Sequence, residues 1–103
     1  MFRIRELIIS SGQEDHIWVK HHVTTSEVDE ACQSTRLVLR GRDSSYAVYG
    51  QTAAGRYLVL FMYPRGQGVF SLATARDVEQ SERRRIQHLE PTDLYDDEED
   101  EEG

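Results

Sequence analysis

One hydrophobic run, residues 57–63, predicts the central strand of the fold. Seven consecutive apolar or aromatic residues stand there between Gly55 and Pro64. A run of this length without polar alternation is typical of a strand buried on both faces. Segments rich in glycine or proline flank it, which predicts a hairpin on either side. The partner strands are expected at residues 46–51 and 69–75, across loops at 52–55 and 64–68.

Capping signals and helical spacing predict two helices before this sheet and one after it. Thr24 and Glu27 have the spacing of a capping box, in which the hydroxyl accepts from a backbone amide and the glutamate reaches back to the cap. Asp77 and Gln80 have the same spacing before the last helix. Trp18 is expected to anchor the core. The other expected elements are an edge strand at 3–9, helices at about 15–21 and 24–33, a strand at 36–40 and a helix from 78 to about 89.

The order of these elements predicts a single α+β domain in residues 1–90. It would have two N-terminal helices, an antiparallel sheet of about four strands with a possible N-terminal edge strand, and a closing C-terminal helix. Residues 91–103 contain eight of the 19 acidic residues, which predicts a disordered acidic tail. The net charge of −7 therefore belongs to the tail, because the rest of the chain is close to balance.

The composition and motifs of the chain limit the cellular compartment and the metal or cofactor sites that can be expected. The single cysteine excludes an internal disulfide, and no apolar stretch approaches the roughly 20 residues of a membrane helix. We therefore expect a cytoplasmic protein without a membrane partner. His16, His21 and His22 lack the spacing of a zinc site, and there is no phosphate loop or dinucleotide fingerprint. These absences lead us to expect neither a metal nor a cofactor.

The register of the two hairpins decides where the arginines of the sheet lie. Counting back from the loop at 64–68 places Arg56 opposite Arg76, and Gln51 would extend the row onto a third strand. Like charges directly opposite each other destabilise a sheet, so this register predicts an anion between them, with phosphate matching the guanidinium fork. The alternative is a bulge in the glycine-rich loop, which would put the two arginines on opposite faces.

The basic residues suit cleavage of RNA without a metal. In such a reaction a base removes the proton of a ribose 2′-hydroxyl, and cations stabilise the pentavalent phosphate. Lys20, His21 and His22 are the candidates for acid and base, and Arg56, Arg65 and Arg76 are the candidates for charge stabilisation. Binding of RNA without cleavage needs the same positive charge. Further RNA contacts are expected from Gln51, His22, Arg83 and Arg84, although a solvated helix face also accounts for the last two.

Several short motifs resemble the BrnT-type toxins of bacterial type II toxin–antitoxin modules, which belong to the RelE-like ribonuclease group. The likeness covers roughly residues 12 to 88 and depends on the order and spacing of the motifs. They are Lys20-His21-His22-Val23-Thr24-Thr25 with Glu27-Val28-Asp29-Glu30, Tyr49-Gly50 with Gly55-Arg56, Thr74-Ala75-Arg76-Asp77, and Glu82-Arg83-Arg84-Arg85.

The resemblance implies a translation-inhibiting ribonuclease that is neutralised by a DNA-binding antitoxin, expected to be a ribbon-helix-helix protein. Lys20 and His21 match the Lys-His pair at the end of the family's first helix, and Arg76 matches the arginine that ends its last core strand. Gln51 departs from the pattern, because members often have arginine there, and Arg56 is the residue that could compensate. The alternative is a non-catalytic module of the same fold that binds RNA or protein. Homo-oligomers are possible in either case.

Overall fold

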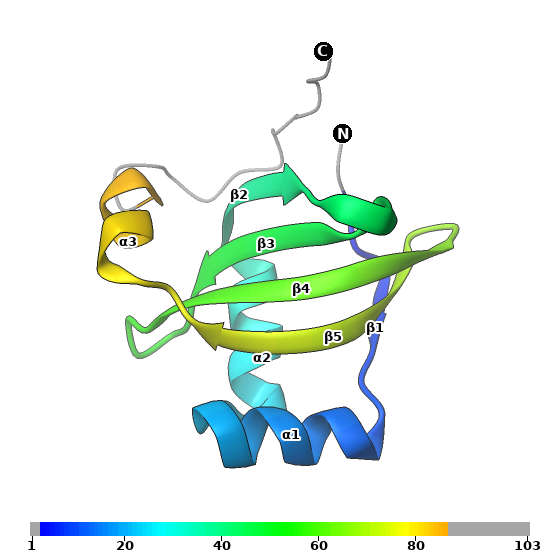
Figure 1. Ribbon diagram of the computed structural model, residues 1–103, viewed down its shortest axis with the longest axis horizontal. Helices are drawn as coiled ribbons and strands as arrows, with labels where there is room; N and C mark the ends of the chain where they lie inside the picture. The colour runs from blue at the N-terminus through cyan, green and yellow to red at the C-terminus, as the bar shows by residue number, and fades with distance from the viewer. Residues whose placement is uncertain (1–2, 87–103) are drawn as a thin grey trace.

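A computed structural model describes residues 3–86 of the chain, as three helices and a five-stranded sheet (Figure 1). The strand order is β1-β5-β4-β3-β2; β2 to β5 are antiparallel, and β1 runs parallel to β5. The predicted α+β fold is confirmed, including the N-terminal edge strand. The elements are β1 (Glu6–Ile8), α1 (Ser11–His21), α2 (Thr25–Gln33), β2 (Thr35–Arg40), a 3-10 turn (Arg42–Ser44), β3 (Tyr46–Gln51), β4 (Tyr57–Gly66), β5 (Val69–Asp77) and α3 (Gln80–Ile86).

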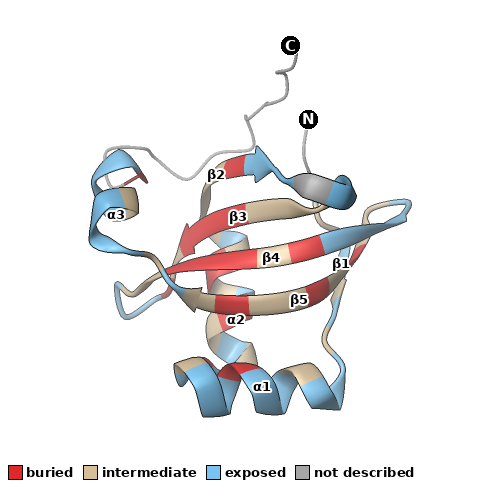
Figure 2. Cartoon of the chain, viewed as in Figure 1, coloured by how far each residue is buried: buried red, intermediate tan, exposed pale blue. Residues whose placement is uncertain are grey.

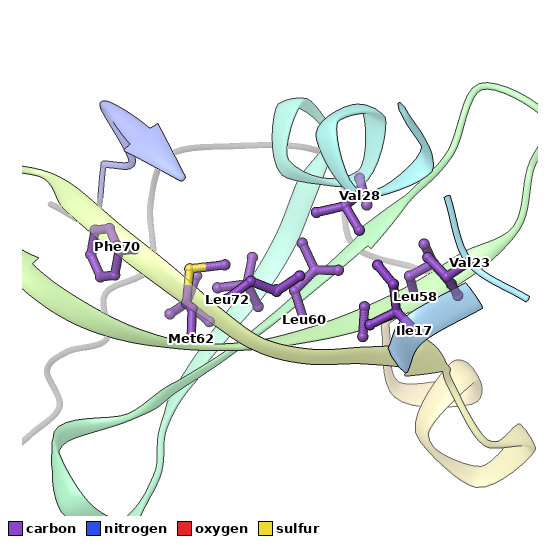
Figure 3. Packing of buried hydrophobic residues seen from close by; sticks show 12 residues of the cluster. Ile17, Val23, Val28, Leu58, Leu60, Met62, Phe70 and Leu72 are labelled. Carbon is purple, nitrogen blue, oxygen red and sulfur yellow. The ribbon is translucent and has the colours of Figure 1, made fainter. Parts of the chain in front are cut away.

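Strand β4 is central and buried on both faces, as its uninterrupted hydrophobic run predicts. One face packs against α1 and α2 and contains most of the core, where Leu58, Leu60 and Met62 meet Ile17 and Val28 (Figure 3). Figure 2 shows that the first half of β4 is largely buried, whereas its end at the β4–β5 hairpin is exposed. Since burial of apolar area is the main favourable term in folding, this layer is the principal source of stability.

The other face of the sheet has a smaller core beneath α3. Tyr49, Val59 and Ile86 are buried there, and Val78 packs beside them. This short helix therefore covers only one end of the sheet face, at the same end as the C-terminus of β5 (Figure 1).

The first two helices begin where their caps place them. The Ser10 hydroxyl accepts from Gln13, so α1 starts four residues before its predicted start. The predicted capping box of Thr24 and Glu27 is present at α2. The prediction that Trp18 anchors the core is wrong, because its side chain is 51% exposed. The residue before it, Ile17, faces the sheet instead and is fully buried.

The predicted register of the β4–β5 hairpin is wrong. Arg76 pairs with Val59, three positions along from Arg56, because both strands continue to a two-residue turn after Gly66 and contain bulges. Side chains alternate between faces, so this odd offset puts the two arginines on opposite sides of the sheet. The predicted row of Gln51, Arg56 and Arg76 does not form, and the bulged alternative describes the structure.

The start of α3 also differs from its prediction. Asp77 is the last residue of β5 and bonds Arg56, so it caps no helix. Instead, the Glu82 carboxylate accepts from the Glu79 amide at 3.0 Å, and the helix begins at Gln80. Its predicted end at Leu89 and the predicted tail at 91–103 lie outside the described residues. Within residues 3–86, no helix has the length and hydrophobicity to span a bilayer.

Candidate functional site

Helix α1 ends in Lys20-His21-His22, which contains three of the predicted site residues. The backbone of His22 is left-handed, with φ 55° and ψ 42°, and its amide donates to the Trp18 carbonyl at 2.9 Å. This conformation stops the helix. It leaves Lys20 exposed and His21 half-buried in the last turn, where the helix dipole favours positive charge.

Arg56 stands beside this segment and uses all five of its N–H donors within the protein. Its Nε and Nη2 form a fork with the Asp77 carboxylate, at 2.6 and 3.0 Å. Its other hydrogens point to the carbonyl oxygens of His21 and His22, at 2.9 and 2.8 Å, and to the Glu27 carboxylate at 3.2 Å. No donor remains for a phosphate. The geometry therefore supports a structural role for Arg56 and not the predicted catalytic contact.

Both carboxylates that hold Arg56 are stabilised in their charged form. The hydrogen bond from Arg56 is the main cause that lowers the pKa of Asp77. The backbone amide of Thr24 is the main cause that lowers the pKa of Glu27, and Arg56 adds to the effect. At neutral pH, then, this arginine is fully compensated by negative charge.

His21 has the properties of a neutral imidazole at pH 7. Partial burial lowers its pKa, and the nearby positive charges of His16, Lys20 and Arg76 lower it further. Only Asp77 acts in the opposite direction. A neutral histidine can accept a proton, so this side chain suits the role of a base. The charges of Lys20 and Arg76 both act on His21, although Arg76 lies on the face of the sheet opposite to α1.

Arg76 lies on the face of the sheet that α3 covers. Its Nη1 donates to the Asp77 carbonyl at 2.9 Å and to Glu82 Oε1 at 3.3 Å, and its guanidinium carbon is 5.5 Å from the centroid of the Phe61 ring. The Tyr49 hydroxyl donates to the second oxygen of Glu82 at 3.2 Å. Within residues 3–86, Nε and Nη2 of Arg76 donate to no acceptor. Arg76 thus keeps donors for an anion, although Glu82 offsets its charge.

The other predicted RNA contacts do not gather at this cluster. Arg65 is exposed near the tip of the β4–β5 hairpin, at the far end of the sheet from the C-terminus of α1 (Figure 1). Arg83 and Arg84 are exposed on α3. Gln51, at the end of β3, accepts from Arg36 Nη2 at 2.8 Å. The structure therefore gathers Lys20, His21, His22 and Arg56 at the end of α1, places Arg76 on the opposite face of the sheet, and leaves the other binding candidates at separate positions.

The sequence did not reveal the acidic partners of Arg56 and Arg76, and it gave no signal for Arg36. Glu27 is recognisable as a helix cap, but nothing local indicates that it also binds Arg56. Asp77 and Glu82 meet their arginines only after the hairpin register and α3 are in place. Arg36 has no motif, and only its place beside Gln51 on the neighbouring strand reveals it.

Metal binding and nucleophilic catalysis by the cysteine find little support in residues 3–86. Among residues 3–86, no group of three or more His, Cys, Asp or Glu side chains could hold a metal ion. Burial raises the pKa of Cys32 to about 12, so this thiol stays protonated and is a poor nucleophile.

Fold and site together define a small α+β protein with a cluster of Lys, His and Arg at one end of a mixed sheet. Its fold is that of the BrnT ribonuclease toxin: the crystal structure of Brucella abortus BrnT matches with a TM-score of 0.60, 13% sequence identity, and coverage of 73% of this chain and 97% of that chain. The BrnT-type resemblance is thus confirmed at the level of the fold. No protein-family profile and no curated protein sequence matches the chain.

Proposed function

We propose that this protein is a ribonuclease that acts as the toxin of a type II toxin–antitoxin module in the cytoplasm and inhibits translation. The observation that carries the proposal is the BrnT fold with Lys20, His21 and Arg76 at one end of its sheet. RNA contacts by His22, Gln51, Arg65, Arg83 and Arg84 belong to the same proposal.

In the proposed reaction, the neutral imidazole of His21 takes the proton of a ribose 2′-hydroxyl. The 2′-oxygen attacks the adjacent phosphorus, and the bond from phosphorus to the 5′-oxygen breaks. The products are a 2′,3′-cyclic phosphate and a 5′-hydroxyl, so no water or metal-bound hydroxide takes part in the cleavage.

The two cations have separate roles in this step. The Lys20 ammonium is exposed next to His21 and donates a proton to the departing 5′-oxygen. Arg76 directs its Nε and Nη2 donors at the phosphate oxygens, where negative charge develops in the transition state. Arg56 acts only indirectly, because it bonds the carbonyl oxygens that end α1 and so positions His21 against β5.

Incubation of the purified protein with RNA in EDTA tests this function. We expect fragments that end in cyclic phosphate, and we expect Arg76→Ala and His21→Gln each to lower the cleavage rate at least about 100-fold. The rate of the wild type should fall as His21 becomes protonated, with a midpoint below about pH 6.5. Arg40→Ala is the control, because Arg40 is the last residue of β2 and has no proposed role in cleavage; this variant should cleave RNA at the rate of the wild type. Intact RNA with the wild type would refute the catalytic proposal.

One observation favours a second candidate, a non-catalytic module that binds RNA or protein. Both arginines predicted to hold phosphate are bound to carboxylates, Arg56 to Glu27 and Asp77, and Arg76 to Glu82. This candidate predicts a gel shift with RNA that weakens with added salt, while the RNA stays intact.

The proposed antitoxin partner can be tested in the same assay. A ribbon-helix-helix protein encoded next to this chain should co-purify with it and stop RNA cleavage at a stoichiometric ratio. Sedimentation of the protein alone and of the complex would show whether either forms a homo-oligomer.

A further inference from the structure

The sheet has one face that its helices leave largely open. Helices α1 and α2 pack on the opposite face, and within residues 3–86 only the seven-residue α3 lies on this one, at one end (Figure 1). Two large hydrophobic side chains are exposed on the strands, Tyr63 at 42% and Leu39 at 36%. A hydrophobic face without a covering layer is typical of an interaction surface.

The pairing register shows which side chains share the open face. One row consists of residues that are directly paired across β2 to β5: Leu39, Ala47, Phe61 and Thr74. Phe61 packs beside the small core under α3, which fixes the face on which this row lies. Since side chains alternate along a strand, Tyr63 stands on the same face, roughly 7 Å further along β4. Phe61 and Tyr63 are therefore neighbouring rings on the central strand.

The guanidinium of Arg76 lies next to the inner ring. Its carbon is 5.5 Å from the centroid of Phe61, and its Nε and Nη2 donate to no acceptor within residues 3–86. The hydroxyl of Thr74, which is paired with Phe61, is buried and also lacks a hydrogen-bond partner in this part of the chain. The row of Phe61 contains no carboxylate, and Glu82 bonds Arg76 from α3. The open face thus offers aromatic rings beside unused donors.

We propose that Tyr63 is a base-stacking subsite for single-stranded RNA on this open face. The subsite rests on the proposed function, in which Arg76 binds the phosphate at which RNA is cut. A strand that leaves this phosphate along β4 passes over Phe61 and brings a base to the exposed ring of Tyr63.

The chemistry of the face favours RNA over a protein segment. The unused donors of Arg76 match phosphate oxygens, whereas an apolar protein segment would leave them without acceptors. The bases of a single strand have open π-faces that stack on aromatic side chains, whereas the bases of a duplex are already stacked. Single-stranded RNA is therefore the occupant that uses both features.

The test uses a short single-stranded 2′-O-methyl RNA, which lacks the attacking hydroxyl and stays intact. Its dissociation constant is measured by fluorescence anisotropy at several salt concentrations. Tyr63→Leu keeps an apolar side chain but removes the ring, and it should weaken binding about 5- to 100-fold, the range for loss of one stacked base. The salt dependence of binding should equal that of the wild type, because no charge is removed.

Tyr63→Phe is the matched control, because it keeps the ring and removes only the hydroxyl. It should bind RNA within about 2-fold of the wild type, since stacking uses the ring face. Both variants should unfold near the wild-type temperature, because Tyr63 lies outside the buried core.

Equal affinity of Tyr63→Leu and the wild type would overturn the subsite and favour a protein partner on this face. Equal weakening by Tyr63→Leu and Tyr63→Phe would contradict stacking, and absence of RNA binding by the wild type would also overturn the subsite. The proposed cleavage is judged separately, with RNA that carries 2′-hydroxyls.

Discussion

At the residue scale, Arg56 shows how far a charged side chain can be interpreted without its surroundings. Counting from the hairpin loop places it opposite Arg76, and this pairing of like charges predicts an anion site. In the fold, its five donors close on two carboxylates and two helix-terminal carbonyls. Glu27 and Asp77 are 29 and 21 positions away. Only tertiary structure could reveal them, because no local pattern links residues so far apart.

Arg56→Ala should therefore destabilise the fold, whatever it does to activity. Hydrogen bonds that involve charged groups contribute about 1.5–3 kcal/mol each when buried, and Arg56 is only partly buried, so we expect a loss of about 2–3 kcal/mol. Arg56→Lys keeps the positive charge but lacks the forked N–H donors of the guanidinium. It should therefore lose about half as much stability as Arg56→Ala. Urea unfolding measures both. Arg65→Ala, in the exposed hairpin, is the control and should change stability by no more than about 0.5 kcal/mol. Equal stability of Arg56→Ala and wild type would exclude the structural role.

At the scale of elements, the features that depend on neighbouring residues could be predicted from the sequence, and those that depend on distant residues could not. The capping box of α2 involves only Thr24 and Glu27, and it was predicted correctly. The bounds of β3 were also correct, because a hydrophobic run between turn residues is a local pattern. The β4–β5 register was wrong, because bulges leave no reliable mark in the sequence and each one moves every later residue to the other face.

The stability of the α2 start should depend on pH through Glu27. Its pKa is lower in the folded state than the usual value of about 4.3, so its stabilising effect is present above that value. This contribution is lost as the pH falls through the lower folded pKa. Urea unfolding at pH 7 should show Glu27→Gln to be about 1 kcal/mol less stable than the wild type. The difference in the free energy of unfolding between Glu27→Gln and the wild type should shrink towards pH 3.

Glu6→Gln provides the comparison for this pH series, because Glu6 is exposed on the edge strand β1. The free energy of unfolding of Glu6→Gln should stay close to that of the wild type at pH 7 and at pH 3. A constant gap between Glu27→Gln and wild type from pH 7 to pH 3 would mean that the carboxylate charge is not what stabilises the helix start.

At the scale of the whole molecule, the fold consists of a sheet with two helices on one face and one on the other (Figure 1). The two-helix layer could be predicted, since α1 and α2 precede a sheet with a hydrophobic central strand. The close approach of α2 to the sheet could not be predicted. It requires Gly50 on β3, where a side chain would collide with the carbonyl oxygen of Ala31. A glycine within a strand pattern signals a bulge or a close contact, and the sequence alone does not distinguish them.

Gly50→Ala should therefore force α2 away from the sheet and disturb the main core. The added methyl group meets the backbone of Ala31, which cannot rotate away as a flexible side chain could. Overpacking of a core costs about 1–3 kcal/mol when side chains can adjust, and here the helix itself must move, so we expect at least about 3 kcal/mol. Gly12→Ala is the matched control, because the nearest atom to its added methyl would be Ser10 Oγ at 3.9 Å. Since alanine is favoured over glycine within a helix, this variant should gain about 0.5–1 kcal/mol. Thermal unfolding of the two variants measures the contrast, and a Gly50→Ala protein as stable as Gly12→Ala would contradict the packing of α2 on β3.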